Sequence, residues 1–296
     1  MRELTVDVSP TVIVSRSKYP VLGPGFRYVA ERFNLCGWRI RQGFQCGAPQ
    51  KSGGCDLVRL LAGVALLPLG LLIGSPHCVG ADVWGGSAAV TSDYIVRGIS
   101  RSNAQAALQL DLHYLSSTGF VAGVFASKTR IDPDQSSDAE LNAYVGLAWA
   151  AGGDWHGKVL ASHYAYPWNR AGSGYDYDEL DVDLTYQEWL GVNLVYSPNA
   201  PRFVRSRGLL GVSSESAEVN LQRPVLGRLS ATAGVGYSYF GGPYGGGYAY
   251  WSVGAAYSIA AVSLVVSYVD TTAGAKALFY DSAAAGRWAG TVIWRF

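Results

Sequence analysis

Residues 228–239 read RLSATAGVGYSY, and this stretch decides the fold class. Apolar residues occupy every second position, namely Leu229, Ala231, Ala233, Val235, Tyr237 and Tyr239. Small or hydroxyl-bearing residues fill the positions between them. Because successive side chains of a β-strand point to opposite faces, this alternation predicts a strand with one apolar and one polar face.

The same alternation recurs from residue 82 to the end of the chain. It predicts twelve strands, at 84–97, 105–115, 119–130, 139–150, 155–166, 177–187, 190–197, 212–223, 228–239, 248–259, 262–270 and 287–296. Most of them exceed the roughly five or six residues that are common in soluble sheets, and they can cross a bilayer when tilted. No window keeps the helical period, so helices are expected to be absent or short.

The predicted connections alternate between short and long. The longer ones are 131–138, 167–176, 198–211, 240–247 and 271–286. Short periplasmic turns and longer outer loops are typical of bacterial outer-membrane barrels. The sequence therefore predicts an all-β protein: a closed antiparallel transmembrane β-barrel of twelve strands with up-and-down topology, in the bacterial outer membrane. Both termini would lie in the periplasm and the long loops outside. A soluble β-sandwich is the alternative, because alternation alone does not say which face meets water.

Composition excludes several other classes. Only 15% of the 296 residues are charged, against about 25% in a typical soluble domain. The absence of repeated Lys and Arg runs argues against a nucleic-acid partner. A single apolar run approaches the length that spans a bilayer as a helix, which excludes a polytopic helical membrane protein.

That apolar run, residues 60–74, reads LLAGVALLPLGLLIG and is followed by small residues up to Ala81. It predicts a signal peptide over 58–81, cleaved after Ala81, rather than a buried or single spanning helix. All four cysteines, Cys36, Cys46, Cys55 and Cys78, precede the cleavage point, as suits a barrel that crosses an oxidising periplasm. Residues 1–57 are expected to be a non-native upstream extension or a disordered leader. Residues 82–296 would form the barrel.

Aromatic residues gather near the ends of the predicted strands, among them Trp84, Tyr94 and Trp288. They predict two girdles at the membrane interfaces. The last strand carries Trp294 and ends on Phe296. A terminal aromatic residue that closes an amphipathic strand resembles the signal read by the bacterial barrel-assembly machinery. The expected partners are this machinery, periplasmic chaperones and the lipid bilayer.

Residues 91–102, TSDYIVRGISRS, resemble the opening motif of a proteobacterial porin family, the TorF-type or Gcw_chp family. Residues 119–127, 195–198 and 267–271 are also similar to it, so the resemblance covers about 82–296. Arg101 departs from the glutamine expected at its position, and the Gly-rich 241–247 segment is individual to this chain. The resemblance implies an outer-membrane barrel of poorly defined transport role and supplies no catalytic residues.

Charged residues follow the polar faces that would line the lumen. They are Asp93, Arg97, Asp111, His113, Lys158, Glu179, Asp181, Asp183, Glu218 and Arg295. They would form either ion pairs that fill a narrow interior or a charged constriction that selects solutes. Glu179, Asp181 and Asp183 form the densest acidic stripe and weakly favour cations. Pairing with Arg97, Lys158 or Arg223 would offset that preference.

The leading functional hypothesis is a channel for small hydrophilic solutes that needs no cofactor. One alternative is a closed structural or adhesive barrel that acts through its loops, with 167–176 or 198–211 folded into the lumen. Another is an outer-membrane hydrolase that pairs His113 or His163 with a serine from another strand. The histidines lack metal-ligand spacing, so neither a metal site nor a catalytic site is expected.

Overall fold

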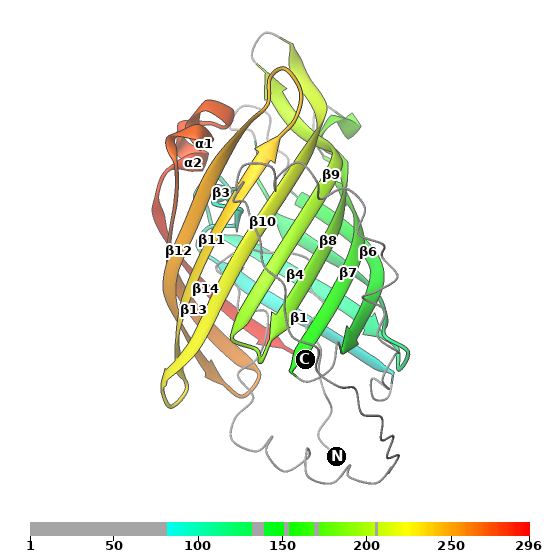
Figure 1. Ribbon diagram of the computed structural model, residues 1–296, viewed down its shortest axis with the longest axis vertical. Coiled ribbons are helices and arrows are strands. Elements are labelled where there is room, and N and C mark those ends of the chain that lie inside the picture. The colour runs from blue at the N-terminus through cyan, green and yellow to red at the C-terminus, as the bar shows by residue number, and fades with distance from the viewer. Residues whose placement is uncertain (1–81, 132–138, 151–153, 169–171, 205–206) are drawn as a thin grey trace, which may run out of the picture. The chain divides into compact units, whose positions relative to one another are not determined.

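The computed structural model describes residues 82–131, 139–150, 154–168, 172–204 and 207–296. In that part of the chain, twelve antiparallel strands close into a barrel in which the first strand pairs with both its neighbour in sequence and the last strand (Figure 1). The barrel strands are β1 (Val83–Thr91), β4 (Ala107–Leu115), β5 (Phe120–Lys128), β6 (Ala139–Ala150), β7 (Trp155–Ala165), β8 (Tyr177–Tyr186), β9 (Leu190–Val204), β10 (Gly208–Leu226), β11 (Leu229–Phe240), β12 (Gly246–Ile259), β13 (Val262–Thr271) and β14 (Arg287–Arg295). The predicted signal peptide, 58–81, and the residues before it lie outside the described residues.

The two faces of the barrel wall have the polarity that a bilayer requires. Leu110 and Val235 point outward, with 49% and 58% of their surfaces exposed. Asp111, next to Leu110, and Ser238, three residues beyond Val235 on the same strand, are buried inside the barrel. A soluble sandwich would bury the apolar face instead, so the prediction of a transmembrane barrel is confirmed. Closure also pairs every strand edge, which lipid would leave without hydrogen bonds.

The short and long connections lie at opposite ends of the barrel, as predicted. The short turns include Ser116–Gly119, Gln187–Trp189, Gly227–Arg228 and Ala260–Ala261. The opposite end carries the connections from β1 to β4 and from β7 to β8, and the one from β13 to β14. The last of these contains the two short helices α1 (Ala273–Leu278) and α2 (Asp281–Ala284). Neither these nor any other helix among the described residues is long and apolar enough to cross a membrane.

Residues 198–211, expected to be a loop, mostly extend the strands β9 and β10. The two strands stay paired up to Val204 and Gly208, and the extended hairpin rises above its neighbours (Figure 1). Pro198 is tolerated because it lies in a register shift of the β9–β10 ladder, where a missing N–H costs no pairing. This segment therefore lengthens the barrel wall, and the prediction that it plugs the lumen is wrong.

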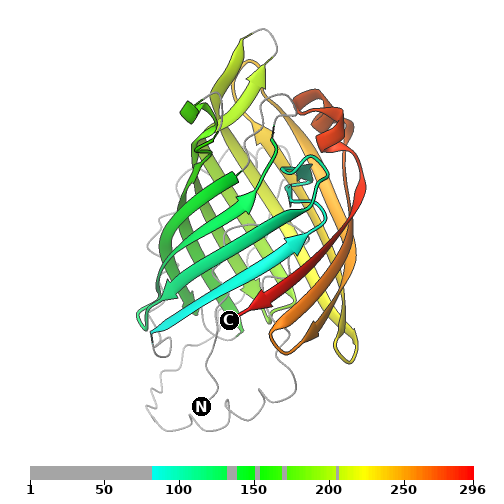
Figure 2. The ribbon, with the colours of Figure 1, turned by 180° about the vertical axis from the view of Figure 1, so that it is seen from behind.

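The predicted strand 84–97 ends early, at Thr91. The chain then turns into the barrel and forms a small hairpin of β2 (Ile95–Val96) and β3 (Ile99–Ser100) (Figure 2). We call residues 93–102 the inner hairpin. Tyr94, placed by the sequence in an interfacial girdle, lies here with 1% of its surface exposed. By contrast Trp84 and Trp288 are outward and exposed, as predicted.

Candidate functional site

The inner hairpin has local reasons to form. Its turn is Arg97-Gly98, and both residues have positive φ, 48° and 79°. Such a turn matches the twist of a two-stranded ribbon. The Asp93 carboxylate accepts hydrogen bonds from the hydroxyls of Ser100, at 2.6 Å, and Ser102, at 2.8 Å. These bonds tie the two ends of the hairpin together.

Two ion pairs fix the hairpin to the barrel wall. The Arg97 guanidinium donates to both carboxylate oxygens of Glu179 on β8, at 2.8 and 3.0 Å. On the other side, Arg287 of β14 donates from Nη1 to Asp93 at 2.9 Å. Arg97 lies outside the barrel strands. Burial would by itself lower the pKa of Arg97, but the Glu179 carboxylate outweighs this and raises it well above its usual value, so the guanidinium stays protonated.

Tyrosine hydroxyls complete the attachment. Tyr94 donates to Glu140 of β6 at 2.7 Å, and Tyr248 of β12 donates to the carbonyl oxygen of Arg97 at 3.0 Å. At the turn, a Cβ on Gly98 would come within 2.7 Å of both Thr271 and Tyr250. The hairpin is thus held by β6, β8, β12 and β14, which are distributed around the barrel. It crosses the lumen and narrows it.

Below the hairpin, toward the short turns, the lumen carries further charged pairs. Lys158 lies 3.1 Å from Asp183, its register partner on the next strand. The Asn193 amide donates to both Asp181 and Asp183 at 2.8 Å. The stripe predicted on β8 therefore lies inside, but two of its three carboxylates have basic partners. Arg223 is not one of these partners, because it is exposed and stacks on Trp189 at 4.0 Å.

The remaining predicted residues also face inward. His113 Nδ1 lies 2.7 Å from Asp111, and the Tyr144 hydroxyl donates to the other oxygen of Asp111. Glu218 accepts a hydrogen bond from Tyr250 at 2.9 Å, and Arg295 donates to Ser263 at 3.0 Å. All ten charged residues predicted for the lumen thus lie inside the barrel. The pairing of the acidic stripe with Arg97 and Lys158 was expected, whereas the other partners were not.

Several buried polar atoms of the wall have no protein partner among the described residues. Both amide atoms of Asn142 belong to this group, as do the side-chain oxygens of Asn220, Gln222, Thr232 and Ser267. A buried polar group without a hydrogen bond costs about 1–3 kcal/mol. Side chains of this kind are stable only where water reaches them. They indicate a hydrated lumen.

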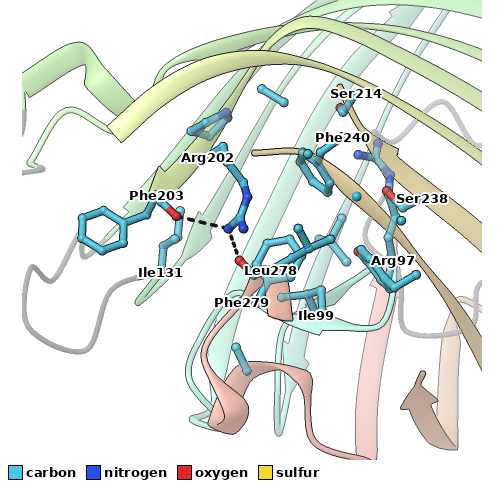
Figure 3. Close-up of a pocket in the computed structure, with 18 of the residues that line it drawn as sticks. Arg97, Ile99, Ile131, Arg202, Phe203, Ser214, Ser238, Phe240, Leu278 and Phe279 are labelled. Carbon is cyan, nitrogen blue, oxygen red and sulfur yellow. Dashed lines mark hydrogen bonds between the residues drawn. The ribbon is translucent and has the colours of Figure 1, made fainter. Parts of the chain in front are cut away.

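Above the hairpin lies a cavity of about 650 Å³, which we call the vestibule. Arg97 of the inner hairpin and Arg202 of β9 line it (Figure 3). Arg101, also of the inner hairpin, is a further lining residue. Phe240 of β11 and Phe279, at the end of α1, supply apolar surface. The extended β9–β10 hairpin and the helical connection therefore form its walls.

Comparison with known proteins identifies the family of this chain. A family profile described as "Bacterial protein of unknown function (Gcw_chp)" matches residues 74–294. The chain belongs to the Gcw_chp family. The resemblance noted in residues 91–102 is confirmed. No curated protein matches the chain.

Solved structures with a similar fold include porins. The NanC porin is 8% identical to this Gcw_chp protein over 71% of this chain and 98% of its own, with a TM-score of 0.46. The KdgM porin is 10% identical over 72% and 99%, with a TM-score of 0.43. An outer-membrane protein of Vibrio cholerae, OmpT with a loop deleted, is 11% identical over 73% and 99%, with a TM-score of 0.36.

His113 and His163, the two histidines of the hydrolase alternative, lie on opposite faces of the barrel wall. His113 faces the lumen, whereas His163 is exposed on the outer surface and pairs with Asp178 at 2.8 Å. In the described part of the chain, neither imidazole has a serine hydroxyl as a hydrogen-bond partner. The described residues also contain no group of three potential metal ligands.

Two anchors of the inner hairpin, Glu140 and Arg287, were not among the predicted lumen residues. Both could have been found from the sequence. Glu140 alternates with Leu141 in a predicted strand, and Arg287 shares the face of Arg295 at the other end of β14. Applying the period-two rule to the first residues of each strand would have placed them inside.

Proposed function

We propose that this Gcw_chp protein is an outer-membrane channel for the passive passage of small hydrophilic solutes or ions. One observation carries the proposal: the wall is apolar outside and charged inside. Leu110 is half exposed, while the adjacent Asp111 has 2% of its surface exposed. Charged side chains at this density suit a lumen that contains water, because burying an ion in a dry interior is costly.

The inner hairpin is the constriction in this proposal. Small solutes would pass beside it along the polar wall, where Asn142, Asn220 and Thr232 present atoms that have no protein partner in the described ranges. A narrowing lined by charged and amide groups discriminates by size and by charge. The exclusion size of the channel would therefore depend on how firmly the hairpin stays attached.

Ion preference is the finer part of the proposal. The sequence favoured cations through the stripe Glu179, Asp181 and Asp183. Because Arg97 pairs with Glu179 and Lys158 with Asp183, the stripe contributes less negative charge than the sequence suggests. We therefore expect at most a slight preference for small inorganic cations.

The proposed orientation follows the lengths of the connections. The short turns and the C-terminus would face the periplasm, and the vestibule with the long loops would face outward. Insertion would use periplasmic chaperones and the barrel-assembly machinery, with Trp294 and Phe296 as the terminal signal. The lipid bilayer would cover the outer face.

Planar-bilayer recording tests the channel. The protein is purified from outer membranes and added to a bilayer between salt solutions of unequal concentration. Discrete current steps are expected, with a reversal potential near zero that indicates little ion preference. The absence of steps at every voltage would contradict the channel.

A closed barrel that acts through its loops is the second candidate. The attachment of the inner hairpin to four strands favours it, because such a plug could seal the lumen. This candidate predicts no current from the native protein and current once the hairpin is loosened. The recording therefore separates the two.

A further inference from the structure

The vestibule differs in charge from the lumen below it. The positive charge of Arg97 is balanced, because its guanidinium donates two hydrogen bonds to the Glu179 carboxylate. Arg101 makes its direct hydrogen bonds, among the described residues, to the hydroxyls of Tyr166 and Tyr177, at 3.3 and 3.4 Å. Those distances are at the long end of hydrogen bonding, so the guanidinium is weakly held. The nearest carboxylate in this network, Glu140, is reached only through Tyr166, whose hydroxyl donates to it.

Arg202 is also without a carboxylate in the described part of the chain. It donates from Nη1 to the carbonyl oxygens of Phe203 and Leu278 (Figure 3). Its Nε is buried and has no protein partner. Two guanidinium groups in one cavity thus make no direct ion pair with a carboxylate of the described residues. A guanidinium presents its N–H groups in a fork that matches a carboxylate.

The other side of the vestibule is aromatic. The rings of Phe240 and Phe279 lie edge to face at 5.7 Å, and Tyr248 meets Phe279 in the same way at 5.7 Å. Leu278 and Ile99 pack in the same cluster. A ligand ring can pack against such side chains in an offset or edge-to-face arrangement. The cavity therefore combines a cationic side and a ring-binding side within about 650 Å³, a volume ordinary for small-molecule sites.

We propose that the vestibule binds small aromatic carboxylates, with the carboxylate on Arg202 and Arg101 and the ring against Phe240 and Phe279. This inference rests on the proposed channel, since it names a class of solute that would bind in the vestibule at the outer mouth of the channel. The slight cation preference expected for small ions arises in the narrower lumen below. It does not oppose binding at the mouth, where the charge is positive.

Ligand-observed fluorine NMR tests the inference on detergent-solubilised protein purified from outer membranes. The probes are para-fluorobenzoate, its neutral analogue para-fluorobenzamide, and fluoroacetate, which has the carboxylate but no ring. Saturable binding of para-fluorobenzoate is expected, with at least about tenfold weaker binding of each of the other two. Equal binding of the benzamide would overturn the role of the arginines, and equal binding of fluoroacetate would overturn the role of the rings.

Variants locate the site. Arg202→Gln and Arg101→Gln should each weaken para-fluorobenzoate binding about tenfold or more, since each removes one charge-assisted contact. Phe279→Ala should weaken para-fluorobenzoate but not fluoroacetate. The matched control is Arg228→Gln, an exposed arginine in a short turn at the opposite end of the barrel, which should change nothing. Equal loss in the Arg228 variant would mean that only the overall charge matters.

Failure of this inference is distinguishable from failure of the channel. NMR binding needs no current, and bilayer recording needs no ligand. Current without para-fluorobenzoate binding overturns the vestibule site and leaves the channel standing. Binding without current keeps the site and overturns the channel.

Discussion

Replacing Arg97 with alanine should release the inner hairpin and widen the lumen. Arg97 makes two charge-assisted hydrogen bonds to Glu179 across the barrel, and the two side chains are only 10% and 3% exposed. The substitution removes both bonds. It also leaves the Glu179 carboxylate buried without its cation.

The size of the effect follows from that burial. Removing one partner of a buried ion pair costs about 3–5 kcal/mol, mostly because the remaining charge is uncompensated. This free energy destabilises the docked state of the hairpin relative to the undocked state, because undocking lets water reach the Glu179 carboxylate. At about 1.4 kcal/mol per factor of ten, the ratio of docked to undocked hairpin should fall by roughly a hundredfold or more.

Single-channel recording and liposome swelling measure this release. The Arg97→Ala variant should show larger or noisier current steps than the native protein, and should admit larger neutral sugars. Adding Glu179→Gln to the Arg97→Ala variant should restore part of the docking, because the buried carboxylate without a cation is then replaced by a neutral amide. Unchanged conductance and exclusion size, in a variant that still folds, would refute the assignment of the hairpin as the constriction.

Lys158→Gln is the control for that experiment. The Lys158–Asp183 pair is also buried, but it joins β7 to β8 within the wall. Its loss should lower the stability of the barrel and leave the exclusion size for sugars unchanged. A similar widening in this variant would show that any lost ion pair loosens the barrel.

Further predictions concern the turn, the lipid face, closure and processing. Gly98→Ala should widen the channel in the same direction as Arg97→Ala, because a φ of 79° costs about 1–2 kcal/mol for a residue with a Cβ and that Cβ would collide with the wall. Leu110→Arg should destabilise the barrel by about 2–4 kcal/mol in urea unfolding in vesicles, with Leu110→Phe near neutral. Deleting Phe296, whose backbone exchanges hydrogen bonds with Gly86 at 2.9 and 3.0 Å, should reduce the heat-modifiable folded form in outer membranes, while Phe296→Tyr should not. Mass spectrometry of the mature protein should find Asp82 at its N-terminus, and a precursor peptide from residues 28–39 would contradict the interpretation of 1–57 as an upstream extension.

The barrel wall could be predicted because the bilayer imposes a rule on every residue of it. A side chain on the lipid-facing side of the wall must be apolar, and the next one, on the lumen side, can be polar. Leu110 and Asp111 show this pattern. Alternation of apolar and polar residues within one strand therefore indicates that the whole barrel lies between lipid and water. For the same reason the inward position of all ten charged residues was predictable, whereas their partners depend on registers and loops that no local pattern encodes.

The inner hairpin was missed because its residues also alternate. Asp93, Ile95 and Arg97 continue the period of β1, so nothing in the period marks the turn after Thr91. The interactions that hold the chain inside the barrel come from residues distant in sequence. Glu179 pairs with Arg97, and Arg287 pairs with Asp93. The local signal of the hairpin is the Arg97-Gly98 turn between the two-residue strands Ile95–Val96 and Ile99–Ser100, which is too short to predict a hairpin alone.

The two features that set this chain apart from its family pattern meet in the vestibule. Arg101 stands where the pattern has glutamine, and residues 245–247 of the individual Gly-rich segment line the same cavity. By contrast, most of the family-like segment 91–102 builds the hairpin below it, through Asp93 and the Arg97-Gly98 turn. We therefore expect Asp93 and the Arg97-Gly98 turn to set the constriction, and Arg101 with residues 245–247 to set the vestibule. Arg101→Gln, which restores the family residue, should therefore fold normally and lose aromatic carboxylate binding while the exclusion size stays the same. A variant that loses binding only because the hairpin has come loose would admit larger sugars as well, and that result would refute this division of roles.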